Sequence, residues 1–170
     1  MRMTLKVASI LTWFNIIFWG FITGVMLLAA LGSMNLPVLL IPVLMSAIPL
    51  NGYAALKLHA SIRRPTLPLS SQTPVGIRFV GFIALFFGIS CLGDGFVLLS
   101  NTKEVLDVFK AQMAQVPQMS QVPGFKSITV SEFRWGGVLV LILGLSIVVN
   151  VVLNLRLLRW YYLVRKSDVS

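Results

Sequence analysis

This chain has 170 residues, of which 57% are hydrophobic and 11% are charged, and its mean hydropathy is +0.90. A soluble domain usually carries about a quarter charged residues, so the composition excludes an ordinary water-soluble fold. The formal net charge is +9, but no polar segment carries a basic run interleaved with aromatic residues, so nucleic-acid binding is not expected. We predict one membrane domain over residues 1–170, an all-α bundle of four transmembrane helices.

The first two predicted spans cover residues 7–31 and 36–57. No charged side chain occurs between residues 7 and 56, which is twice the length that one span requires. The first apolar stretch is also longer than the about 7–15 residues of a signal-peptide core, so it is expected to stay as a span. Gly32, Asn35 and Pro37 predict a tight turn between the two. Pro42 and Pro49 each remove a helical hydrogen bond and predict bends in the second span.

The remaining chain is expected to alternate between loops and spans. A polar loop over 58–76 leads to a third span over 77–100, and an outer loop over 101–132 leads to a fourth span over 133–157 and a tail over 158–170. Within the outer loop, residues 103–116 place Val105, Phe109, Met113 and Val116 at helical spacing. This stripe predicts a short amphipathic helix that either covers the bundle end or lies on the lipid surface.

The distribution of Lys and Arg predicts the orientation. Ten fall on one side: Arg2, Lys6, Lys57, Arg63, Arg64, Arg78, Arg156, Arg159, Arg165 and Lys166. Four fall on the other: Lys103, Lys110, Lys126 and Arg134. The positive-inside rule therefore places both termini and the 58–76 loop in the cytoplasm, and we expect the plasma membrane, in a bacterium the inner membrane.

Asp94 interrupts the third span about six residues before its outer end, or roughly 9 Å deep. A carboxylate at that depth needs a partner, water or a proton. Arg134 begins the fourth span on the same side, so the two can form an ion pair that joins the spans. The alternatives are a shallow hydrated carboxylate, or an ion or proton site.

Several amides are predicted to lie at one depth. Asn15, Asn51 and Asn150 each lie seven or eight residues from the inner boundary, about 10–12 Å deep. Ser146, Asn150 and Asn154 recur every four residues and form a polar stripe on the fourth span. This intramembrane layer is expected to make interhelical hydrogen bonds. The alternative is a hydrated vestibule or a polar headgroup site.

Small and basic residues add two further expectations. Gly20 and Gly24 form a GxxxG pattern, and Gly81 and Gly88 form a small face on the third span; we expect helix packing, with dimerisation as the alternative. The basic residues near the inner end of the fourth span could bind anionic lipid headgroups or could serve orientation alone: Arg156, Arg159, Arg165 and Lys166.

Little in the sequence points to catalysis, a metal or a cofactor. Cys91 is the only cysteine and His59 the only histidine, and His59 is expected at the inner boundary, a bilayer away from Asp94. We therefore expect a non-enzymatic accessory, assembly or scaffolding component of a membrane complex, with a protein partner or a second copy in the bilayer. The alternative is a small transporter or channel that uses Asp94 and the asparagine layer.

Overall fold

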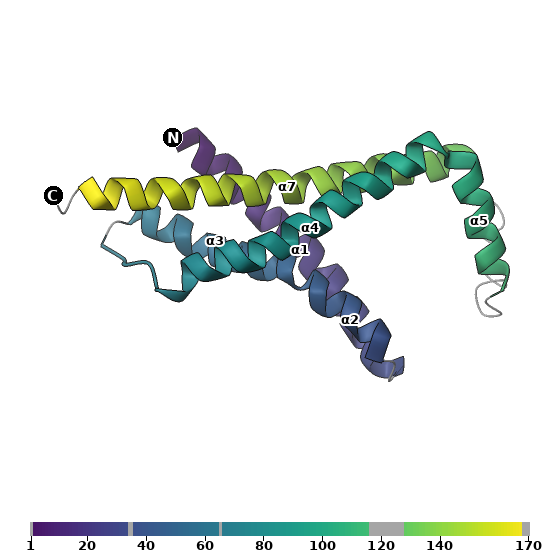
Figure 1. The fold of residues 1–170 in the computed structure, drawn as a ribbon, viewed down its shortest axis with the longest axis horizontal. Helices are drawn as coiled ribbons and strands as arrows, with labels where there is room; N and C mark the ends of the chain where they lie inside the picture. Colours follow the sequence, from purple (N-terminus) through teal and green to yellow (C-terminus); the bar gives the residue numbers. More distant parts are fainter. Residues whose placement is uncertain (1, 34–35, 65, 116–127, 168–170) are drawn as a thin grey trace. The chain divides into compact units, whose positions relative to one another are not determined.

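The computed structural model of this chain describes residues 2–33, 36–64, 66–115 and 128–167. The elements in these ranges are all α-helices (Figure 1): α1 (Arg2–Ser33), α2 (Leu36–Met45), α3 (Ala47–Arg63), α4 (Gln72–Ser100), α5 (Thr102–Ala114) and α7 (Val130–Ser167). Four stretches of the described chain are long and apolar enough to cross a membrane: Met3–Gly32, Pro37–Arg63, Gln72–Ser100 and Val130–Val164. The prediction of an all-helical chain with four such stretches is confirmed.

The second of these stretches is divided into α2 and α3 at Ser46. Pro49 causes the division, because its ring has no N–H and collides with the carbonyl four residues earlier, that of Met45. The chain stays close to helical across the break, since the Ser46 amide donates to Pro42 O at 2.9 Å and the Leu50 amide donates to Ser46 O at 3.1 Å. Of the two prolines, Pro49 therefore divides the span and Pro42 stays inside α2.

Several helix ends lie outside the predicted spans. The loop expected over 58–76 is shorter, because α3 continues to Arg63 and α4 begins at Gln72. Pro74 falls in the first turn of α4, where its missing amide costs no helical bond. Near the C-terminus, α7 continues to Ser167, so residues 158–167 of the expected tail are helical.

A capping box explains why α7 begins at Val130, three residues before the predicted start. The Thr129 amide and hydroxyl each donate to Glu132 Oε2 at 2.8 Å, and the Glu132 amide donates to Thr129 Oγ1 at 3.3 Å. This reciprocal pairing satisfies amides that have no partner inside the helix.

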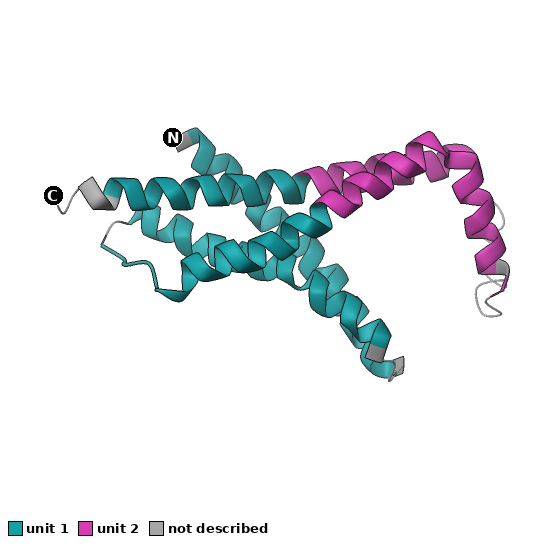
Figure 2. Cartoon of the chain, in the orientation of Figure 1, with its two compact units in different colours: residues 1–88, 146–170 teal, residues 89–145 magenta. Residues whose placement is uncertain are grey.

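The contacts divide the chain into two compact units (Figure 2): unit 1 is Met1–Gly88 with Ser146–Ser170, and unit 2 is Ile89–Leu145. Both α4 and α7 contribute residues to each unit. In unit 1 an apolar core joins four helices through five buried side chains: Ala8, Leu58, Ile77, Leu157 and Leu158. The prediction of one membrane domain stays a prediction.

The described helices expose apolar side chains and bury polar ones. Ile10 is 70% exposed and Phe82 72%, whereas Thr12 and Asn15 are fully buried. In water this arrangement would lose the hydrophobic contribution to folding, but in hydrocarbon it leaves the apolar side chains well solvated. The distribution is that of a multi-pass membrane protein.

In unit 2, the amphipathic helix expected over 103–116 is α5, Thr102–Ala114. Leu106 is 2% exposed, and the rings of Phe109 on α5 and Phe133 on α7 lie 5.7 Å apart between centroids. Val105 and Met113 of the predicted stripe are partly buried, and Val116 lies outside the described residues. Phe109 of the predicted stripe thus contacts α7, whereas the buried Leu106 was not part of the sequence pattern.

Candidate functional site

A closed triangle of hydrogen bonds joins α1 to α7 inside unit 1. Thr12 Oγ1 donates to Asn150 Oδ1 at 2.8 Å, and Asn154 Nδ2 donates to the same oxygen at 3.1 Å and to Thr12 Oγ1 at 3.4 Å. All three side chains are 2% exposed or less. Each donor in the triangle meets an acceptor, so these buried groups satisfy one another.

His59 extends this triangle to α3. Its Nε2 lies 2.9 Å from Asn154 Oδ1, and since an amide oxygen can only accept, Nε2 is the ring nitrogen that carries the proton. The side chain is 2% exposed. His59 fell within the loop expected over 58–76, but α3 continues to Arg63 and includes it, one turn before the helix end.

A second connection between α1 and α7 involves Asn15 and Ser146. Ser146 Oγ donates to Asn15 Oδ1 at 3.3 Å, and Asn15 Nδ2 donates to Ser146 O at 3.4 Å and to Leu11 O at 2.9 Å. We call these two hydrogen-bonded groups together the polar joint: Thr12, His59, Asn150 and Asn154 in the first, and Asn15 and Ser146 in the second. It links α1, α3 and α7.

The predicted alignment of asparagines differs from this arrangement by one helical turn. Asn15 bonds to Ser146 and Asn150 bonds to Thr12, so Asn15 and Asn150 are not bonded to each other. The prediction counted inward from assumed span ends, whereas α7 continues well beyond 157. The sequence reasoning also missed Thr12, which its i, i+3 spacing with Asn15 could have revealed.

Asn51, the third predicted amide, faces α4. It is 1% exposed, and a Cβ built at Gly81 would lie 3.0 Å from its Oδ1. That oxygen has no hydrogen-bond partner among the described residues, and the same holds for Nδ1 of His59. Because Nε2 of His59 is the donor, Nδ1 is an acceptor as well. The side of α3 that is buried in the bundle therefore carries two acceptor atoms without donors among the described residues.

Asp94 and Arg134 both belong to unit 2, but helix packing keeps them apart. A Cβ at Gly95 would lie 2.7 Å from Cγ of Leu141, so Asp94 is level with Leu141. Arg134 is seven residues away along α7, about 10 Å. Both side chains are exposed, and no ion pair to Asp94 is found among the described residues. Asp94 therefore faces outward without its predicted partner.

The predicted packing glycines differ in their surroundings. A Cβ at Gly88 would lie 2.9 Å from Val148 Cγ2, and Gly81 is in close contact with Asn51, so both allow close helix approach. Gly20 has only an ordinary 3.9 Å contact with Pro49, and nothing lies within 4 Å of a Cβ at Gly24. The tightest site on α3 is Gly52, where a Cβ would lie 2.5 Å from Cγ1 of Ile16. Sequence reasoning overlooked Gly52.

The basic residues at the far end of α7 are only partly described. Arg156 and Arg159 are exposed, as a headgroup contact or an orientation signal requires, whereas the side chains of Arg165 and Lys166 lie outside the described residues. On the neighbouring α3, Arg63 Nη2 donates to Ser9 Oγ at 3.2 Å and so links α3 to α1.

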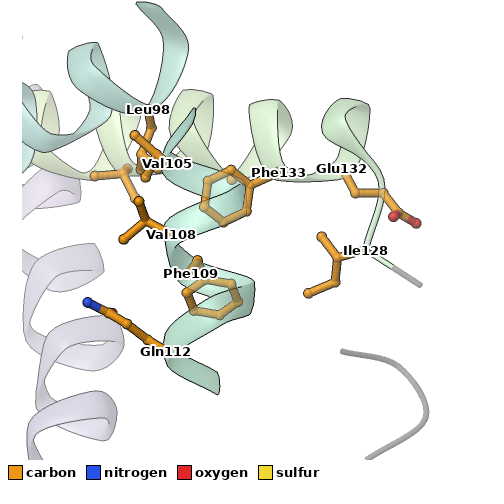
Figure 3. A pocket seen from close by; sticks show the side chains of 10 residues that line it. Leu98, Val105, Val108, Phe109, Gln112, Ile128, Glu132 and Phe133 are labelled. Carbon is orange, nitrogen blue, oxygen red and sulfur yellow. The ribbon is translucent and has the colours of Figure 1, made fainter. Parts of the chain in front are cut away.

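A largely apolar groove of about 840 Å³ lies in unit 2, between α5 and the facing parts of α4 and α7 (Figure 3). Its lining residues are Leu98, Val105, Val108, Phe109, Gln112, Ile128, Glu132, Phe133, Gly136 and Val140. Among the described residues, no group of three or more His, Cys, Asp or Glu is placed to hold a metal ion.

Comparisons with family models, with curated proteins and with solved structures found no match to this chain.

Proposed function

We propose that this chain is a non-catalytic component of a membrane complex, acting as an accessory, assembly or scaffolding subunit. The observation that supports this most directly is the polar joint. Its hydrogen bonds run from helix to helix, and Thr12, Asn150 and Asn154 satisfy one another. Polar groups used in this way stabilise one arrangement of helices. They are not available to exchange water or ions along a path.

The chemistry of the joint favours the same proposal. It consists of two hydroxyls, three amides and one imidazole. It has no carboxylate that would orient His59 and no activated nucleophile beside that ring. Catalysis by a histidine base normally requires such partners within hydrogen-bond distance. A structural role needs only the interhelical bonds themselves.

The proposal includes a location. The excess of Lys and Arg near the ends of the spans favours a plasma membrane, in a bacterium the inner membrane, with both termini in the cytoplasm. The bilayer and at least one protein in it are then the partners of the chain.

A small transporter or channel remains the second candidate, and one observation favours it. Asn51 Oδ1 and His59 Nδ1 are buried acceptors on the same face of α3, eight residues or about 12 Å apart, without donors among the described residues. Water or a cation moving along α3 could use both atoms. Asp94 would belong to another part of such a path.

Native mass measurement after mild detergent extraction from the source membrane tests the first candidate. We expect a species heavier than the 18.8 kDa chain that contains a second protein in fixed stoichiometry. A solitary monomer in several detergents would contradict the proposal.

Ion and proton flux into proteoliposomes tests the second candidate, with Asn51→Leu and Asp94→Asn as variants. We expect no flux above that of empty liposomes. A wild-type flux that either variant abolished would replace the accessory role with transport.

A further inference from the structure

We propose that Asp94 on α4 is the docking point for a transmembrane helix of a different protein, one that carries a Lys or Arg side chain at the same depth. This inference rests on the proposed role in a membrane complex and specifies the chemistry of the partner. It follows from the depth of Asp94, its exposure and the charge pattern of the chain.

The depth of Asp94 follows from the register of α4 against α7. Residues 135–155 of α7 carry no charge and extend about 31 Å, which matches the about 30 Å hydrocarbon thickness of a bilayer. Arg134 therefore marks the outer limit of the hydrocarbon. Because Gly95 packs on Leu141, Asp94 lies about 10 Å inside that limit.

The surface around Asp94 is open and apolar. Val97, three residues after Asp94 and on the same side of α4, is 48% exposed, and Cys91, three residues before it, is partly exposed. Gly93, directly beside Asp94, is exposed, and nothing lies within 4 Å of a Cβ built there. A glycine with free space beside it lets the backbone of another helix come close. The carboxylate would otherwise face hydrocarbon, where an unpaired charge is strongly unfavourable.

Charge complementarity identifies the occupant as a cationic side chain. A Lys or Arg offers the donors and the positive charge that an ionised carboxylate needs at low dielectric constant. This chain has no such residue within 7–56, 79–93 or 135–155. A second copy in the same orientation could offer Arg134, but that residue lies at the outer limit of the hydrocarbon, about 10 Å shallower than Asp94. A different protein fits better.

Defined synthetic helices provide the test. The probe is a transmembrane peptide of Leu and Ala with one Lys placed about seven residues from its outer end, reconstituted with the full-length chain in phosphatidylcholine vesicles. Association is measured by energy transfer between labels on the peptide and on the chain. A peptide with Leu in place of Lys, and one with the Lys seven residues from the inner end, control for general helix association.

We expect the outer-Lys peptide to bind about tenfold more tightly than either control peptide, and Asp94→Asn to remove that preference. The matched control Asp107→Asn removes an exposed carboxylate from α5, outside the four candidate spans, and should leave binding unchanged. Equal binding of all three peptides, or binding that Asp94→Asn does not change, would overturn the inference.

Two further measurements separate this inference from the proposed function. If the native complex forms but the peptides show no dependence on Asp94, the complex assembles through another surface and only the inference fails. Energy transfer between two labelled copies of the chain that disappears in Asp94→Asn would assign the surface to a second copy, and so would overturn a partner of different sequence.

Discussion

Thr12 on α1 and Asn150 on α7 are joined by a 2.8 Å hydrogen bond between two buried side chains that lie 138 positions apart in the sequence. The bond connects the first and last spans of the chain directly. Because Asn154 bonds to both residues, the loss of one member affects three side chains. The polar joint is therefore the place where substitutions should be most informative about helix arrangement.

Replacing Thr12 with Val removes the hydroxyl but keeps the shape of the side chain. We expect the free energy of unfolding in bicelles to fall by about 0.6–2 kcal/mol, the usual value of an interhelical polar contact in a membrane. A double-mutant cycle with Asn150→Ala should show a coupling energy of the same order, since the two side chains are in contact. Ile10→Val, at a 70% exposed position on the same helix, is the control and should change little. Additive effects of the two substitutions would show that the bond contributes nothing.

His59 should contribute through its Nε2–H. His59→Phe leaves Asn154 Oδ1 buried without a donor, and we expect it to cost about 1–3 kcal/mol of unfolding free energy, visible as a lower Tm in detergent. His59→Gln can place an amide N–H near the same oxygen and should recover part of the loss. Tyr53→Phe, on an exposed face of α3, serves as the control. A Phe variant as stable as wild type would refute a role for this hydrogen bond.

Gly52 and Gly24 should respond in opposite ways to alanine. At Gly52 the new Cβ would lie 2.5 Å from Ile16 Cγ1, so we expect overpacking that costs about 1–3 kcal/mol. At Gly24 the space is open, and the higher helix propensity of Ala should leave stability unchanged or slightly raised. Thermal unfolding of both variants makes the comparison. Ile16→Ala in the Gly52→Ala background should restore much of the loss, and failure to do so would point to another cause.

The packing of α5 depends on Leu106 and Phe109. Leu106 is 2% exposed and the Phe109 ring contacts that of Phe133, so Leu106→Ala and Phe109→Ala should each increase amide hydrogen exchange across Thr102–Ala114. Val108 is 52% exposed, and Val108→Ala should leave the exchange rates of this helix nearly unchanged. Similar exchange in all three variants would mean that α5 is held by something other than this face.

Sequence reasoning predicted the helical spans well because their signal is local. Long runs without charge have few alternatives to a membrane helix, and Pro49 acts on a carbonyl only four residues away. The helix ends were less predictable. Thr129 and Glu132 extend α7 at one end through a capping box, and α3 runs on past the polar residues Lys57 and His59.

The candidate site was predicted only in part. Asn15, Asn51, Ser146, Asn150 and Asn154 were recognised as polar residues in apolar helices, which is a property of sequence alone. Their partners depend on rotation and register between helices, and a shift of one turn changes which side chains meet. His59 was assigned to a loop, and the Asp94–Arg134 pair assumed that helix ends are level, whereas the Gly95–Leu141 contact sets a different register.

Composition and short-range pattern establish that this chain has four hydrophobic helices, where polar residues interrupt them, and how the charge is distributed along it. These properties follow from composition and from interactions between residues a few positions apart. Helix packing adds that Thr12 and His59 belong to the polar joint, that Gly52 on α3 lies in tight contact with Ile16, and that Asp94 faces outward. Such relationships depend on how helices pack over long sequence separations, where a single methyl group or hydroxyl selects one register among several of similar hydrophobicity.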